Sequence, residues 1–184
     1  TALFIVIFTM SLNAQYGKKG TVELGGEAGF SSSTSVFDGE SADESTTNFF
    51  ISPMIGYFVI DGLQLAFIPL EFSSYSHGDY STTSFDVWFA PGYVFDMQSN
   101  VYPFVNALIG YNTSTSKNGS EATYSGLQYG VFGGIKVLLG KNALLNVGLT
   151  YRQITSEPED WDGDRVGGNV FAAVVGFTVF LGKK

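Results

Sequence analysis

Apolar and polar side chains alternate along most of the chain after residue 20. Between residues 21 and 30, Val22, Leu24 and Ala28 alternate with Glu23 and Glu27. Alternation with a period of two is typical of a β-strand that has one apolar and one polar face. The same pattern predicts eight strands, at residues 21–30, 49–59, 63–72, 85–95, 103–111, 127–137, 145–151 and 170–181.

The connections between these predicted strands alternate between long and short. Long polar stretches occupy residues 31–48, 73–84, 112–123 and 155–168, and short turns occupy residues 61–62, 96–100 and 140–142. This order predicts an up-and-down meander with all long loops at one end. A tilted membrane strand needs about 9–11 residues, which the predicted strands approach. We therefore expect an all-β fold, an eight-stranded antiparallel up-and-down transmembrane β-barrel.

The two phases of each strand differ in size as well as polarity. In the strand at 85–95, Phe85, Val87 and Phe89 alternate with the smaller Asp86 and Ala90. The interior of an eight-stranded barrel is just wide enough for side chains to fill. Bulky residues outside and small polar residues inside therefore favour a lipid-facing wall. A soluble barrel with its apolar face inside is the alternative.

Residues 52–67, SPMIGYFVIDGLQLAF, combine two alternating strands with a two-residue turn. Aromatic residues also lie near many of the predicted strand ends, as expected for the girdles at the two membrane interfaces. In these features the chain resembles the small eight-stranded outer-membrane barrels of Gram-negative bacteria, the OmpA-like and OmpX-like members of the porin family. The resemblance implies an integral protein of the bacterial outer membrane with loops at the cell surface.

The N-terminal residues have a different character. Residues 2–12 form an apolar run of 11 residues, within the range of about 7–15 for the core of a secretory signal peptide. Ala14 is small enough to precede a cleavage site. We expect residues 1–14 to be an N-terminally clipped signal peptide and residues 15–184 to be the outer-membrane barrel. A buried first strand is the alternative reading of this run.

Composition and charge exclude several classes of function. The chain has 23 Gly and 17 Phe, but 1 His and no Cys, and its net charge is −8. Without Cys it has no disulfide framework, thiol chemistry or Cys-based zinc site. The negative charge disfavours nucleic-acid binding, which requires a basic face. We expect no cofactor and no nucleic-acid partner.

Five charged residues fall on the phase that we expect to face the lumen. They are Glu23, Glu27, Asp86, Lys136 and Arg152. Charged groups in a narrow lumen must pair or stay hydrated. We expect Glu23 and Lys136 to lie near the short-turn end, and Asp86 and Arg152 near the long-loop end, as two ion-pair layers that fill the lumen. A narrow porin for small solutes is the alternative.

The long loops are acidic, with eleven Asp and Glu residues against Lys117 and Arg165. In the fourth loop, Asp160, Asp162 and Asp164 alternate around Gly163 and form a candidate cation contact. The complete twelve-residue calcium loop, which ends in Glu, is missing. We therefore predict no firm metal site. An acidic solvated surface is the simpler interpretation.

Some small outer-membrane barrels modify lipid A, and that chemistry needs a Ser, a His and an acid within hydrogen-bond reach. His77 is the single candidate base, with Ser74, Ser76 and Asp79 nearby in sequence. We expect a surface His and no enzymatic activity. The expected role is structural or adhesive, in a monomer that contacts outer-membrane lipid, lipopolysaccharide or an extracellular ligand through its loops.

Overall fold

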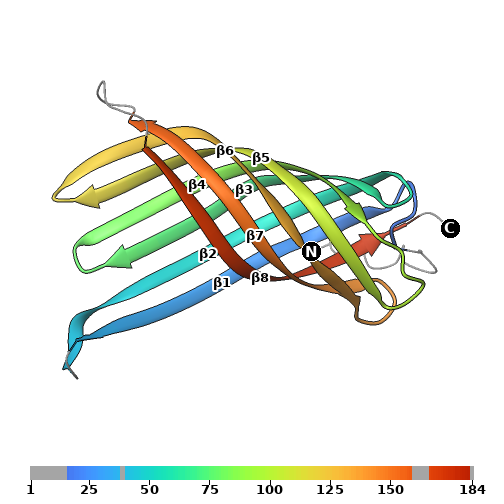
Figure 1. Cartoon of the computed structure of the whole chain (residues 1–184), viewed down its shortest axis with the longest axis horizontal. Coiled ribbons are helices and arrows are strands. Elements are labelled where there is room, and N and C mark those ends of the chain that lie inside the picture. Colours follow the sequence, from blue (N-terminus) through green and yellow to red (C-terminus); the bar gives the residue numbers. More distant parts are fainter. Residues whose placement is uncertain (1–15, 38–39, 159–165, 183–184) are drawn as a thin grey trace, which may run out of the picture.

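The computed structural model describes residues 16–37, 40–158 and 166–182. Its strands form one closed barrel in chain order (Figure 1). They are β1 (Val22–Phe37), β2 (Glu40–Ile60), β3 (Leu63–His77), β4 (Tyr80–Val94), β5 (Val101–Asn118), β6 (Ser120–Leu138), β7 (Ala143–Pro158) and β8 (Val166–Leu181). Among the described residues, no helix is long and apolar enough to cross a bilayer.

Every strand pairs antiparallel with its neighbours in the sequence, and β1 closes the barrel against β8, with Val22 opposite Leu181. The predicted fold, an eight-stranded up-and-down barrel, is thereby confirmed. The turns at residues 61–62, 95–100 and 139–142 lie at one end, which we call the short-turn end. At the opposite end, which we call the hairpin end, β1, β3, β5 and β7 end and β2, β4, β6 and β8 begin.

The prediction of long polar loops is wrong, because most of the residues assigned to those loops belong to strands. β3 and β4 are separated by residues 78–79, and β5 and β6 by Gly119 alone. Cross-strand hydroxyl contacts stabilise these polar extensions: Ser84 donates to Ser114 at 3.1 Å, and the hydroxyls of Thr115 and Thr123 lie 3.2 Å apart. Thr is also favoured in strands because it is β-branched. Polar character therefore marked the end of the lipid-facing wall, not the end of the strands.

The outward and inward phases are as predicted. Phe85, Val87 and Phe89 are exposed, whereas the alternate residues Asp86 and Ala90 are buried. The bulky side chains thus cover the outside of the barrel and form a lipid-facing wall. Val59 departs from the expected outward phase and is half-buried, because the ladder between β2 and β3 shifts register next to it.

Three of the prolines within strands lie where the ladders are interrupted. Pro53 and Pro69 lie inside an interruption between β2 and β3, and Pro91 lies inside one between β4 and β5. Proline has no N–H to donate to a neighbouring strand. β3 also has one extra residue between Ile68 and Glu71 relative to β4, so a bulge lies at this point.

Two clusters of buried apolar side chains occupy the interior. The larger one lies at the short-turn end and contains Tyr16, Phe58, Val94, Tyr102, Phe104, Leu144 and Phe180. The second contains Ala66, Trp88, Ala90 and Leu108. Residues 16–21, which precede β1, fold across the short-turn end, where Gly62 donates its N–H to the carbonyl of Gly17 at 2.8 Å. This segment brings Tyr16 into the first cluster.

Candidate functional site

The carboxylate of Glu23 is the centre of the first polar layer in the lumen. Glu23 is fully buried on β1, and Lys136 on β6 reaches it across the barrel, with 2.6 Å between Nζ and Oε1. Three further donors complete its contacts: the hydroxyl of Thr178 at 2.7 Å, Nε2 of Gln64 at 2.6 Å and the hydroxyl of Tyr16 at 2.8 Å. The structure thus brings together Glu23 and Lys136, as expected, and adds three partners.

An aromatic stopper closes the barrel just below this layer; we define it as Tyr16, Phe58, Tyr102 and Phe180. The ring of Tyr16 lies 5.4 Å from that of Phe58, 5.0 Å from that of Tyr102 and 5.1 Å from that of Phe180, measured between centroids. All four side chains are buried. The other three rings pack edge to face or tilted against the ring of Tyr16. Together the four side chains fill the lumen at the short-turn end.

A second polar layer lies towards the hairpin end. Arg152 on β7 pairs with Glu71 on β3, with 2.5 Å between Nη1 and Oε1 and 3.4 Å between Nη2 and Oε2. The guanidinium carbon of Arg152 lies 5.0 Å from the centre of the Trp88 ring. Arginine interacts strongly with a carboxylate in a bidentate ion pair, and its guanidinium is further stabilised by stacking on an indole ring. It spans the lumen from β7 to β3.

The expected pair of Asp86 with Arg152 is wrong. Asp86 instead accepts hydrogen bonds from the side-chain amides of Asn112, at 2.8 Å, and Gln128. Arg152 is paired with Glu71, a residue that the sequence analysis did not identify. The bulge in β3 explains why Glu71 reaches the lumen, because Pro69 and Leu70 both face outward and the next residue, Glu71, turns inward. An acid on a lipid-facing phase, close after a proline, was the available signal.

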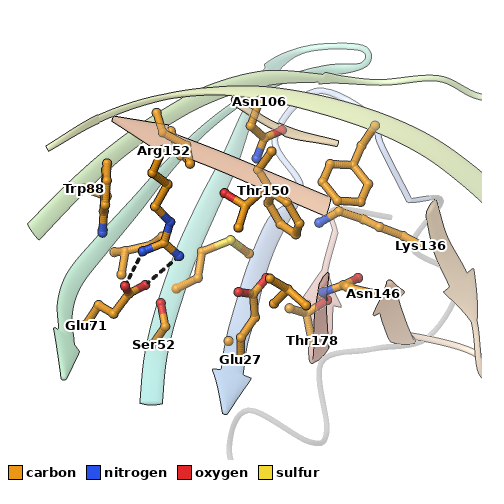
Figure 2. Close-up of a pocket in the computed structure, with 18 residues that line it drawn as sticks. Glu27, Ser52, Glu71, Trp88, Asn106, Lys136, Asn146, Thr150, Arg152 and Thr178 are labelled. Atoms are coloured by element: carbon orange, nitrogen blue, oxygen red, sulfur yellow. Dashed lines mark hydrogen bonds and ion pairs between the residues drawn. The ribbon is translucent and has the colours of Figure 1, made fainter. Parts of the chain in front are cut away.

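A small cavity of about 40 Å³ separates the two polar layers (Figure 2). It has room for about two or three water molecules. Four buried polar atoms that have no hydrogen-bond partner among the described residues belong to side chains that line it: Nε1 of Trp88, Oδ1 of Asn106, Oδ1 of Asn146 and Nε of Arg152. The cavity is therefore polar on several sides and well suited to hold water.

Glu27, the remaining member of the predicted charge network, points into this cavity from β1 (Figure 2). It makes no hydrogen bond or ion pair with the part of the chain that the structure describes. Lys136 and Arg152 are the nearest cations in the lumen, and both are paired with other carboxylates. Glu27 is thus the lumen acid without a partner of its own.

Above the second layer the lumen widens into an outer vestibule of about 260 Å³. Glu71, Asp86 and Arg152 lie at its floor, and the hydroxyls of Ser73 and Ser84 line its wall. The vestibule therefore ends on the Arg152–Glu71 pair. From the hairpin end inward, the lumen is a polar vestibule, an ion pair, a small cavity, a second ion pair and an aromatic stopper.

The other predicted sites are the acidic residues of the fourth loop, the signal peptide and His77. Asp160, Asp162 and Asp164 lie outside the described residues, as do residues 1–15 with the predicted signal peptide. His77 is exposed at the end of β3, opposite Tyr80. Within the described ranges there is no group of three or more side chains arranged to hold a metal ion.

Comparisons with known proteins agree with this architecture. Residues 1–178 match the family model described as "Outer membrane protein beta-barrel domain". No curated protein sequence matches the chain significantly.

Two solved structures are similar in fold. Neisserial surface protein A (NspA) has a TM-score of 0.59 and 21% identity over 88% of this chain and 97% of its own. The outer membrane protein OprG from Pseudomonas aeruginosa has a TM-score of 0.61 and 14% identity over 93% of this chain and 100% of its own. At these identities the likeness concerns the fold. The family match covers nearly the whole chain, and the chain therefore belongs to the outer membrane protein β-barrel family, a group of transmembrane proteins of the bacterial outer membrane.

Proposed function

We propose that this protein is a non-conducting surface barrel, anchored in the outer membrane as a monomer, which makes contacts outside the cell through its hairpin end. In bacterial outer-membrane barrels the short turns face the periplasm and the longer connections face outward. The aromatic stopper then lies on the periplasmic side, and the vestibule opens outward. The activity therefore resides in the extracellular surface and not in passage through the lumen.

The occluded lumen carries this proposal. A solute moving through the barrel would have to separate two ion pairs from opposite walls, Lys136 with Glu23 and Arg152 with Glu71, and then displace the ring of Tyr16. Breaking a buried ion pair costs about 3–5 kcal/mol. This arrangement supports a plugged barrel over the alternative of a narrow porin.

The hairpins supply the second support. Beyond Tyr111, β5 continues to Asn118 in register with β6. Seven strand residues at about 3.3 Å each, tilted by about 40°, would raise the hairpin roughly 18 Å above the aromatic band. Its tip carries an exposed ion pair between Lys117 and Glu121 at 3.0 Å. Hydroxyl-rich sheet held by cross-strand contacts offers a stiff polar surface to a binding partner.

An enzymatic role has less support. His77 is exposed at a hairpin end, whereas a catalytic base normally lies in a concave site that excludes water. We therefore propose no catalytic residues, and we assign to His77 a place on the contact surface.

Shortening the hairpins tests the proposal. In one variant, residues 74–83 and 114–124 are each replaced by a two-residue turn, and a matched control replaces residues 140–142 at the periplasmic end. Both variants should keep the faster migration of the unboiled barrel on SDS gels. Expressing cells should lose adherence to an epithelial monolayer only with the shortened hairpins. Undiminished adherence of cells with intact, shortened barrels would contradict a contact role for these hairpins.

A further inference from the structure

Glu27 lies in the wall of the barrel at a depth where a charged group is expensive. It is five residues beyond Val22, the first residue of β1, which places it about 13 Å from the periplasmic rim for a strand tilted by about 40°. The hydrocarbon band of such barrels is about 25 Å tall, so Glu27 lies near its middle. Ionisable side chains within a membrane usually mark a functional site, and they need a partner.

The pairing of β1 with β8 closes the barrel, and we call it the seam. It ends at Glu27. β1 and β8 are paired from Val22 opposite Leu181 to Glu27 opposite Gly176. Beyond that point both strands continue, but they are no longer paired with each other, and Figure 1 shows them diverging towards the hairpin end. Glu27 therefore lies at the last paired position between β1 and β8, where the two strands begin to separate.

An apolar groove of about 450 Å³ on the outer face leads to the same corner, a size in the usual range for small-ligand sites. The strand backbone at Gly25, Gly26 and Gly176 forms its floor. Its walls are Ile51, Pro53, Leu145, Val175 and Phe177.

The groove and the internal cavity share three lining residues, Gly26, Glu27 and Ser52. Gly176 lies opposite Glu27 in the strand pairing, and a Cβ atom there would come within 2.7 Å of Cγ of Glu27, so a residue without a side chain is needed to make room for Glu27. Glu27 therefore lines both the internal cavity and the outer groove.

We propose that this groove binds a single-chain amphiphile with an ammonium head. The head pairs with Glu27 at the end of the β1–β8 seam, and the alkyl chain lies in the groove between Ile51 and Val175. An ionised carboxylate only accepts hydrogen bonds, which matches the donors of an ammonium group. Lys136 and Arg152 are both committed to other acids, so the cavity offers no free cation for a carboxylate ligand. A phospholipid is a poor occupant, because its headgroup lies at the membrane interface and not at mid-depth.

A titration followed by NMR tests this inference in the intact barrel, held in nonionic micelles. The probes are dodecylammonium, dodecanol and dodecanoate, which share a chain and differ in the head. The amide signals of Gly25, Gly26 and Gly176 report on the groove floor. Wild type should show saturable shifts at about tenfold lower concentration for dodecylammonium than for dodecanol, since a hydrogen bond to a charged group contributes about 1.5–3 kcal/mol.

Three variants locate the binding. E27Q should remove the preference for the ammonium head while retaining the weak binding of the chain. A28F, which fills the groove from its lipid side, should weaken all three probes. D86N removes one negative charge from the lumen away from the groove and should bind dodecylammonium as wild type does.

Equal affinity of wild type for the three probes would overturn the proposal, as would an ammonium preference that persists in E27Q. Faster migration of unboiled protein on SDS gels verifies that each variant has folded. If E27Q fails this check, the proposal is tested by the head-group preference of wild type together with the weaker binding of all three probes to A28F.

Discussion

Lys136 and Glu23 come from different walls of the barrel, β6 and β1, and their charged groups meet in the lumen 2.6 Å apart. Both side chains are almost completely buried. Because the partners are distant in sequence, the contact forms only when the barrel closes. The ion pair therefore specifies which strand positions come together, in addition to filling the lumen.

Removing one partner of this pair should be more harmful than removing both. K136M leaves the carboxylate of Glu23 buried without its cation, and we expect a loss of about 3–5 kcal/mol in the free energy of unfolding. The double variant E23Q/K136M should recover part of that loss. Urea unfolding in phospholipid vesicles measures both. A double variant that is no more stable than K136M would show that the buried charge is not the cause.

A double-mutant cycle distinguishes the two possible partners of Arg152. We expect R152M and E71Q to be coupled by about 0.5–3 kcal/mol, because their side chains are in direct contact. R152M and D86N should be closer to additive, since Asp86 is held by the amides of Asn112 and Gln128. Stronger coupling of Arg152 to Asp86 than to Glu71 would contradict the observed pairing.

Tyr16 contributes mainly through its ring. Y16F removes the hydrogen bond to Glu23 and should cost about 1 kcal/mol. Y16A removes the ring that contacts Phe58, Tyr102 and Phe180, and a loss of about 3–5 kcal/mol is expected for a buried aromatic. The temperature at which the unboiled SDS-gel band disappears ranks the variants. Equal effects of the two would mean that the hydrogen bond, not the ring, holds the stopper.

Acid should loosen the segment that carries Tyr16. The pKa of Asp61 is lowered because its carboxylate accepts a hydrogen bond from the backbone N–H of Lys19 and a second from Lys18. A lowered pKa in the folded state means that this contact stabilises the segment above the ordinary carboxyl pKa of about 3.9 and is lost as the pH falls through the folded value.

The N–H of Gly62, which is bonded to Gly17, should therefore become less protected from hydrogen exchange as the pH falls below about 4, after correction for the intrinsic rate. D61N should produce the same loss of protection at neutral pH, whereas D79N, a substitution at the hairpin end, should not. Unchanged protection in D61N would mean that Asp61 does not hold this segment.

The sequence predicted the number and direction of the strands because period-two alternation survives wherever one face meets lipid and the other meets a narrow lumen. It did not identify Glu71 as a lumen residue, because one extra residue in β3 reverses the phase there. It also failed where strands continue above the membrane, because neither face there is apolar. Tyr16 was missed because a segment that folds back across the barrel has no periodicity of its own.

Single-channel recording in planar lipid bilayers tests the central claim, that the lumen is closed by two ion pairs and an aromatic stopper. The purified barrel is first shown to be folded by its faster migration when unboiled, and it is then inserted into the bilayer in potassium chloride. The structure predicts insertion without discrete conductance steps. Reproducible steps from folded wild-type protein would contradict the claim and identify the barrel as a narrow porin.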